Sequence, residues 1–137
     1  MAPTAPTVKL DADALASRLA GAIRIPTIST ADRAQVDHAA FEALHTYLEQ
    51  TFPRVHNASG VRRETFGRHG LLYVWSGSDP TLRPILLLAH QDVVPVNEGT
   101  KANWVHAPFS GRIADGYIWG RGTLDIKIGV MGALEAV

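Results

Sequence analysis

The sequence of 137 residues contains no cysteine. Disulfide frameworks, thiolate zinc sites and cysteine nucleophiles are therefore excluded, and any bound zinc must be held by histidine and carboxylate side chains. An excess of charge is also missing, because 13 lysines and arginines balance 13 aspartates and glutamates. Nucleic acids and anionic membranes both require clustered positive charge, which argues against either partner. These absences indicate an ordinary neutral globular protein.

The chain also lacks the features of a secretory leader and of a membrane span. Residues 1–7 contain neither a basic segment nor an apolar one, so they do not resemble a signal peptide. No apolar run reaches the length needed to cross a bilayer. We therefore expect a cytoplasmic location, and a flexible Pro/Thr/Ala-rich tail over residues 1–10.

Apolar spacing predicts two helices in the first part of the chain. Asp11 is a candidate N-cap, apolar residues then recur every four positions to Ile23, and Pro26 ends the helix. A longer helix is expected over residues 31–50, followed by Pro53. Its apolar stripe consists of Val36, Ala40, Phe41, Leu44, Tyr47 and Leu48.

Strand-like segments follow the helices. Residues 61–66 and 71–75 are separated by turn-forming residues. Residues 85–89 are apolar without alternation, which is typical of a central strand covered on both faces. A small hairpin is expected over residues 110–119, around an Asp-Gly turn. Two long helices followed by such strands predict a layered α/β domain.

The end of the chain reads as the inside of a helix. A helical pattern begins at Ile126 and continues to Val137, and no glycine cap, proline or charged last turn follows it. This pattern predicts that the chain is a truncated piece of a longer domain, with no interdomain linker between residues 11 and 137.

His90, Asp92 and Asp125 are the strongest candidates for chemistry. Side chains two apart on a strand share a face, so His90 and Asp92 can converge where the apolar strand ends, at the edge where α/β sheets bind ligands. A neutral imidazole is a good zinc ligand, and a nearby carboxylate can fix its tautomer. Asp125 supplies an oxygen ligand that could bridge two cations. The pattern is short, however, and a histidine that caps a strand and hydrogen-bonds a local carboxylate would give the same residues.

Other residues carry weaker signals. Glycines at positions 120 and 122 allow unusual backbone angles on the approach to Asp125, although a hairpin exit explains them equally well. The third glycine of a dinucleotide-binding fingerprint is missing. Surface or packing roles are expected for the remaining histidines, which are His38, His45, His56, His69 and His106. The aromatic residues that either line a substrate cleft or pack a loop are Trp104, Phe109, Tyr117 and Trp119.

Three ordered blocks carry a resemblance to a known family. They are Leu-Leu-Leu-Ala-His-Gln-Asp-Val-Val-Pro-Val at residues 86–96, Trp104 with Pro-Phe-Ser-Gly at residues 108–111, and Asp-Gly-Tyr-Ile-Trp-Gly-Arg-Gly-Thr-Leu-Asp-Ile-Lys at residues 115–127. In these blocks the chain resembles the aminoacylase/carboxypeptidase family of dinuclear zinc metallopeptidases, and most closely its carboxypeptidase S-like branch. The resemblance is strong over residues 86–137 and looser at residues 25–29.

This resemblance implies a role for each site residue by its position. His90 matches a ligand of one zinc ion, and Asp125 matches the carboxylate that bridges both ions. Asp92 matches the catalytic aspartate that orients the histidine and assists the general base. In the family the peptide bond after the bridging aspartate is often cis, which here is Asp125–Ile126. Many relatives carry a second acidic residue where this chain has Ile126.

The resemblance also implies a fold and its organisation. Residues 11–137 correspond to the N-terminal portion of a layered catalytic domain, a mixed and largely parallel sheet flanked by helices. In the family the rest of this domain and a dimerisation domain follow Val137, so the full-length protein would be a homodimer. The general-base glutamate and the remaining metal ligands lie in that later portion.

The implied reaction is zinc-dependent hydrolysis of an amide bond in a small peptide or an N-acyl amino acid. Two zinc ions fill the complete site, and cobalt or manganese could replace them at histidine and carboxylate ligands. Because this chain supplies only part of that site, we expect it to be inactive by itself. The alternative is a truncated, non-catalytic homologue that serves as a binding or interaction module.

Overall fold

The computed structural model describes residues 8–137, so most of the tail expected at residues 1–10 lies outside the described residues. The helices are α1 (Ala12–Ile23), α2 (His38–Thr51), α3 (Pro53–His56) and α4 (Ile128–Glu135). The strands are β1 (Val61–Phe66), β2 (Gly70–Trp75), β3 (Arg112–Ala114) and β4 (Tyr117–Trp119). The expected α/β class is confirmed. Among residues 8–137 no helix has the length and apolar character of a membrane span.

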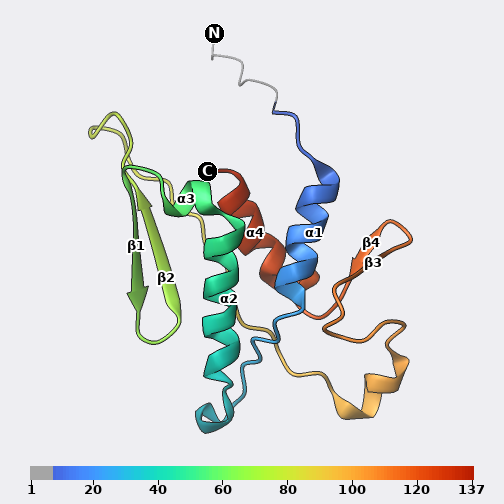
Figure 1. Cartoon of the computed structure of the whole chain (residues 1–137). Coiled ribbons are helices and arrows are strands. Elements are labelled where there is room, and N and C mark those ends of the chain that lie inside the picture. The colour runs from blue at the N-terminus through green and yellow to red at the C-terminus, as the bar shows by residue number, and fades with distance from the viewer. Residues whose placement is uncertain (1–7) are drawn as a thin grey trace.

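Helices α1, α2 and α4 pack side by side, with one hairpin on each flank of the group (Figure 1). The predicted start of α1 is confirmed, because the Asp11 carboxylate accepts a hydrogen bond from the Ala14 amide at 3.0 Å. The buried apolar cluster between the helices consists of Leu19, Ala22, Ile23, Leu44, Leu48, Phe52, Val55, Met131 and Leu134. Burial of these side chains is the main force that holds the helices together.

Helix α2 begins later than the sequence predicted. It starts at His38 rather than at residue 31, because the Asp37 carboxylate accepts from the amides of Ala39 and Ala40 at 3.0 and 3.3 Å. A side chain that satisfies the free amides of a first turn defines the helix start. Asp32 instead caps a separate 3-10 helix, Arg33–Gln35, ahead of α2.

Two antiparallel hairpins form the described sheets. Strands β1 and β2 pair from Val61 with Trp75 to Phe66 with Gly70, which confirms the predicted pair of strands. Strands β3 and β4 form the smaller hairpin. Its turn uses positive φ angles at Asp115 (54°) and Gly116 (78°), as the Asp-Gly pair predicted.

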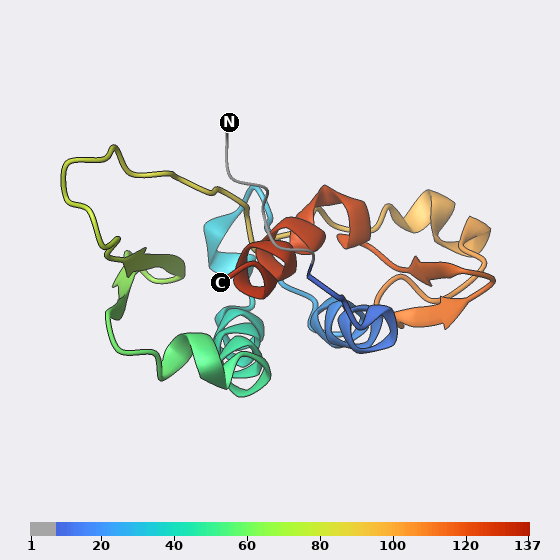
Figure 2. The same cartoon turned by 90° about the horizontal axis from the view of Figure 1, so that it is seen from above.

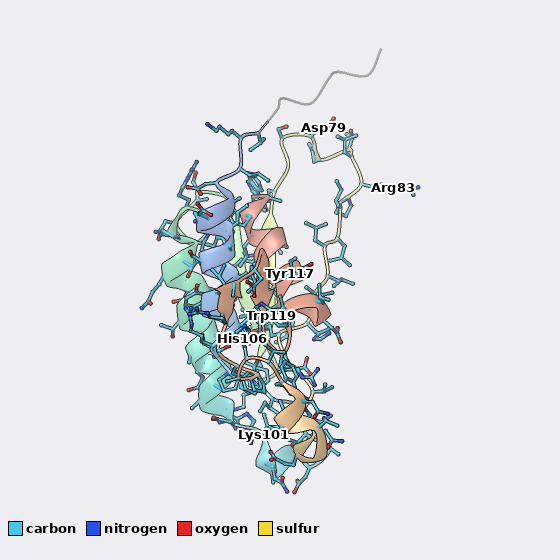
Figure 3. All side chains as sticks on the ribbon, turned by 90° about the vertical axis from the view of Figure 1, so that its right-hand side faces the viewer. Asp79, Arg83, Lys101, His106, Tyr117 and Trp119 are labelled. Carbon is cyan, nitrogen blue, oxygen red and sulfur yellow. The ribbon has the colours of Figure 1, made fainter. Side chains whose placement is uncertain are left out.

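The prediction of a central strand at residues 85–89 is wrong for this structure. Residues 8–137 contain no strand that pairs with this segment, and Ile85 is 88% exposed. A central strand requires a neighbour on both sides. The only parallel pairing within these residues is a single bridge between Ile28 and Val93, so the predicted largely parallel sheet is reduced to that bridge. Figure 2 shows the chain looping away from the helices after β2, and Asp79 and Arg83 lie on this loop in Figure 3.

Gly111 is the point at which the β3 segment packs against α1. Its φ angle is 54°, and a Cβ atom there would collide with the backbone carbonyl of Ala20. We expect Gly111→Ala to lower the free energy of unfolding by about 2–4 kcal/mol, since a left-handed residue costs ~1–2 kcal/mol and a forced contact adds ~1–3 kcal/mol. Urea unfolding of the full-length protein measures this loss.

Gly116→Ala is the matched control for this substitution. Gly116 also has a positive φ angle, 78°, but apart from its chain neighbours no atom lies within 4 Å of the place that a Cβ atom would take. The control therefore isolates the backbone cost of about 1–2 kcal/mol. An equal decrease in the free energy of unfolding in the two variants would show that the close contact between Gly111 and α1 does not contribute to stability.

Candidate functional site

The His90–Asp92 segment is held beside the end of α1 by backbone and side-chain hydrogen bonds. The Val93 amide donates to the Thr27 carbonyl and the Ser29 amide donates to the Val93 carbonyl, both at 2.9 Å. Thr27 is fully buried, and its hydroxyl donates to the Gln91 carbonyl at 2.6 Å. The segment therefore has a fixed backbone path even though residues 85–89 before it are exposed.

His90 lies between the two predicted carboxylates. Its Nδ1 atom is 2.9 Å from the Asp92 carbonyl oxygen and 3.2 Å from Asp92 Oδ1. Its Nε2 atom is 3.1 Å from Asp125 Oδ1. The structure thus brings together all three residues that the sequence singled out, although Asp125 is 35 positions from His90.

The contacts of Nδ1 determine the tautomer of the neutral His90 ring. A carbonyl oxygen can only accept, so Nδ1 carries the proton and donates it to Asp92. The Nε2 lone pair of the neutral ring then faces Asp125. An imidazole held in this way by its other nitrogen is the usual arrangement of a metal-binding histidine.

The charges around His90 also affect its titration. Burial by itself disfavours the imidazolium, but the hydrogen bonds with Asp125 and Asp92 and their negative charges outweigh it and raise the pKa of His90 above its usual value. The two carboxylates thus concentrate negative potential at this ring. The same potential attracts a cation.

Asp125 is presented by a tight turn, Thr123–Lys127, that follows the β3–β4 hairpin. Gly122 has a φ angle of 86°, and a Cβ atom there would press on the Val93 side chain. Glycine therefore lets the turn approach the segment that follows His90. The predicted cis peptide bond between Asp125 and Ile126 is confirmed. The Asp125 side chain is 84% exposed, so it is open to a ligand.

Lys127 anchors this turn to α1. It is only 1% exposed, and its Nζ atom donates to the carbonyls of Ala22 at 2.9 Å and Ile25 at 2.5 Å. Burial lowers the pKa of Lys127 to about 8. The ammonium group lies at the C-terminal end of α1, where the helix dipole favours a positive charge.

The donor set at His90 and Asp125 suits part of a zinc site. Imidazole nitrogen and carboxylate oxygen are both common zinc ligands, and they fit two positions of a tetrahedral ion. Residues 8–137 contain no group of three or more histidine, aspartate or glutamate side chains placed to hold a metal ion. The described chain therefore offers His90 and Asp125 as candidate ligands, with Asp92 behind the histidine.

The remaining histidines make hydrogen bonds or ring contacts with other side chains, which fits the surface or packing roles expected of them. His38 and His45 are half-buried on α2. His38 Nδ1 is 2.7 Å from His69 Nε2, and His45 Nε2 is 2.8 Å from Gln91 Oε1. His56 bonds the Tyr73 hydroxyl at 2.9 Å.

The aromatic residues that lie between Asp92 and Asp125 in the sequence pack among themselves. His106 and Tyr117 both contact the ring of Trp119, whose indole nitrogen donates to the Ala114 carbonyl at 3.1 Å (Figure 3). The Arg121 guanidinium lies over Trp104 at 5.4 Å. These contacts favour the packing alternative over a substrate cleft.

Sequence reasoning missed three residues that support the site: Thr27, Gln91 and Lys127. Two of them had a visible signal. Gln91 stands between two candidate site residues, and Lys127 is a charged residue inside the apolar pattern of the last helix. Their partners, however, are distant in sequence, which made their roles invisible to local patterns.

Comparison with known proteins gives consistent matches. The model of peptidase family M20/M25/M40 matches residues 86–137. The chain is 42% identical over 128 residues to carboxypeptidase S of Saccharomyces cerevisiae, covering 88% of this chain and 22% of that protein. It is 46% identical over 125 residues to the probable carboxypeptidase S-like 2 of Dictyostelium discoideum, covering 90% and 23%.

A further relative carries a different activity in its name. The chain is 40% identical over 124 residues to the N-fatty-acyl-amino acid synthase/hydrolase PM20D1 of Bos taurus, covering 90% of this chain and 24% of that protein. The chain thus spans less than a quarter of the length of each of these three relatives.

Proposed function

This chain belongs to the peptidase family M20/M25/M40, and from that membership we propose that the protein containing it hydrolyses an amide bond in a small peptide or an N-acyl amino acid. The observation that carries the proposal is the placement of His90 between Asp92 and Asp125. A histidine fixed at Nδ1, with Nε2 facing a carboxylate, is suited to bind a metal ion.

Each of the three residues has a separate task in this proposal. His90 and Asp125 would hold the metal, and Asp125 would be the carboxylate shared by two zinc ions. Asp92 accepts the Nδ1 proton of His90, which keeps the ring oriented and increases its basicity. The bound metal would supply a Lewis acid for the scissile carbonyl and would lower the pKa of the attacking water.

The substrate class follows from the names of the relatives. One relative is a carboxypeptidase and another is an N-fatty-acyl-amino acid synthase/hydrolase. Peptides and N-acyl amino acids share an amide bond next to a free carboxylate, so we propose substrates of this common structure. Residues 11–137 would contribute the N-terminal portion of the catalytic domain, in a cytoplasmic homodimer.

Metal removal from the full-length protein tests this proposal. We expect dialysis against a chelator to lower amide hydrolysis by at least about 100-fold, because metal polarisation of the carbonyl is worth several kcal/mol. Added Zn²⁺ or Co²⁺ should restore it, with about two ions bound per chain at saturation. The assay compares dipeptides and N-acyl amino acids with their carboxyl-amidated forms.

The zinc-binding and hydrolysis measurements distinguish a metallopeptidase from a non-catalytic binding or interaction module. A full-length protein that binds no zinc and hydrolyses none of these substrates would support a binding or interaction module instead. Hydrolysis that survives complete metal removal would contradict the metallopeptidase proposal. Equal rates with free and amidated substrates would contradict the proposed substrate class.

A further inference from the structure

Gln91 makes three hydrogen bonds to other parts of the protein, although its sequence neighbours His90 and Asp92 have exposed side chains. Its Oε1 atom is 2.8 Å from His45 Nε2 on α2. Its Nε2 atom donates to the backbone carbonyl of His69, in the turn between β1 and β2, at 2.8 Å. Its own carbonyl accepts the Thr27 hydroxyl at 2.6 Å. Three separate parts of the fold therefore converge on one residue.

The chemistry of these partners allows a single orientation of the Gln91 amide. The His69 carbonyl can only accept, so the amide NH₂ must face it and the amide oxygen must face His45. The His45 ring then carries a proton on Nε2. A flipped amide would place two oxygens against each other at the turn. The link is therefore directional rather than an adaptable polar contact.

The turn that accepts from Gln91 is itself fixed to α2. The His69 ring stacks on Phe41 with centroids 4.4 Å apart and hydrogen-bonds His38 at 2.7 Å. Burial, and then the nearby His38 and His45, lower the pKa of His69, so its ring is neutral at neutral pH. A neutral stacked ring keeps the turn against the helix, which gives Gln91 a rigid acceptor.

We propose that Gln91 is a positioning residue: its amide, held between His45 and the His69 carbonyl, fixes the segment in which His90 faces Asp125. This inference rests on the proposed function, because the segment matters through the metal that His90 would bind. Loss of the amide leaves two hydrogen bonds in place, from the Val93 amide to the Thr27 carbonyl and from the Thr27 hydroxyl to the Gln91 carbonyl. Residues 90–92 are then free to rotate about these two points. His90 then no longer presents Nε2 to Asp125 in one geometry.

The test is metal affinity of the full-length protein, measured with Zn²⁺ by competition against a chromogenic chelator. We expect Gln91→Leu to weaken zinc binding by about 10–100-fold, the usual effect of removing an outer contact that orients a ligand. The visible absorption of the Co²⁺ form should also change, since it reports ligand geometry. KM for the substrate should stay within about twofold, because both ends of the Gln91 amide are already occupied by His45 and the His69 carbonyl.

The control is Gln50→Leu, the same substitution at an exposed position at the end of α2. It should leave both the zinc affinity and the Co²⁺ spectrum unchanged. Thermal unfolding of the metal-free variants shows whether each protein is folded before metal is added. A loss of affinity equal in both variants would overturn the proposal.

Variants of His45 test the positioning role of Gln91 independently of the Gln91 substitution. His45→Gln keeps an N–H donor toward Gln91 and should retain most of the zinc affinity, whereas His45→Leu should weaken zinc binding by up to the about 10–100-fold expected of Gln91→Leu. If Gln91 acts through His45, the double variant with Gln91→Leu should be no weaker than Gln91→Leu alone. Additive losses would mean that the two residues act separately, and the proposed link would be wrong. If Gln91→Leu does not fold, the two His45 variants still provide the comparison.

Failure of this inference differs from failure of the proposed function. A wild-type protein that binds no zinc and shows no hydrolysis contradicts the function. A wild-type protein that does both, with Gln91→Leu indistinguishable from it in zinc affinity and Co²⁺ spectrum, contradicts only the positioning role.

Discussion

Asp125→Ala in the full-length protein is expected to lower kcat/KM for amide hydrolysis by about a thousandfold or more. The substitution removes the carboxylate proposed to be shared by two metal ions, and metal stabilisation of the transition state is worth several kcal/mol, where each ~1.4 kcal/mol is tenfold. His90→Ala should have a comparable effect, because Nε2 faces Asp125 at 3.1 Å. Steady-state kinetics and bound zinc per chain measure both losses.

Asp92→Asn separates the role of Asp92 from those of its two neighbours. Its carboxylate contacts His90 Nδ1 at 3.2 Å, and the backbone carbonyl at 2.9 Å remains as a second acceptor. Zinc affinity should therefore fall less than in the two ligand variants, by about 10–100-fold. Asp13→Asn, at an exposed position in the first turn of α1, is the control. For the two ligand variants, wild-type turnover by Asp125→Ala or His90→Ala would contradict the proposal that these residues bind a catalytic metal ion.

Local sequence signals predicted those parts of the fold whose information lies within a few residues. The Asp11 cap, the β1–β2 hairpin and the Asp115-Gly116 turn all formed as expected. The start of α2 was missed because two aspartates, Asp32 and Asp37, each offer a cap. The structure uses both of them, one for a 3-10 helix and one for α2.

The apolar run at residues 85–89 shows why a strand cannot be predicted from composition alone. Its hydrophobicity indicates a segment suited to burial, but a strand also needs neighbours whose amides and carbonyls pair with it. Residues 8–137 supply that pairing only after the run, at Val93 with Ile28. Hydrophobic character is a property of the segment, whereas strand pairing is a property of its surroundings.

The candidate site likewise contains residues that the sequence could predict and residues that it could not. His90, Asp92 and Asp125 were identified from their residue types and from the family resemblance, and the structure brings them together. The residues that support them could not be identified in this way, because their partners are far along the chain. Gln91 bonds His45 46 positions away, and Lys127 bonds Ala22 105 positions away. Such contacts depend on the packed arrangement of α1, α2 and the Asp125 turn, which no local pattern describes.

Lys127→Met is expected to destabilise the full-length protein by about 2–4 kcal/mol and to displace Asp125. The ammonium group makes charge-assisted hydrogen bonds to the carbonyls of Ala22 and Ile25, and such bonds contribute ~1.5–3 kcal/mol each. Part of this loss is offset because methionine no longer carries a buried charge. Both carbonyls also keep a backbone amide donor, which limits the cost of losing the side chain.

Lys101→Met is the matched control for Lys127→Met, since Lys101 is exposed and, within residues 8–137, forms an ion pair only with Glu98, three positions before it, at 3.2 Å. Exposed pairs of this kind contribute ~0–1 kcal/mol, so the control should unfold close to the wild-type midpoint. Thermal unfolding of the metal-free proteins gives the stability difference, and zinc competition gives the effect on Asp125. Because Lys127 connects the Asp125 turn to the end of α1, its loss should lower both the unfolding midpoint and zinc affinity. Equal midpoints for the two variants would mean that the buried ammonium does not hold the turn against α1.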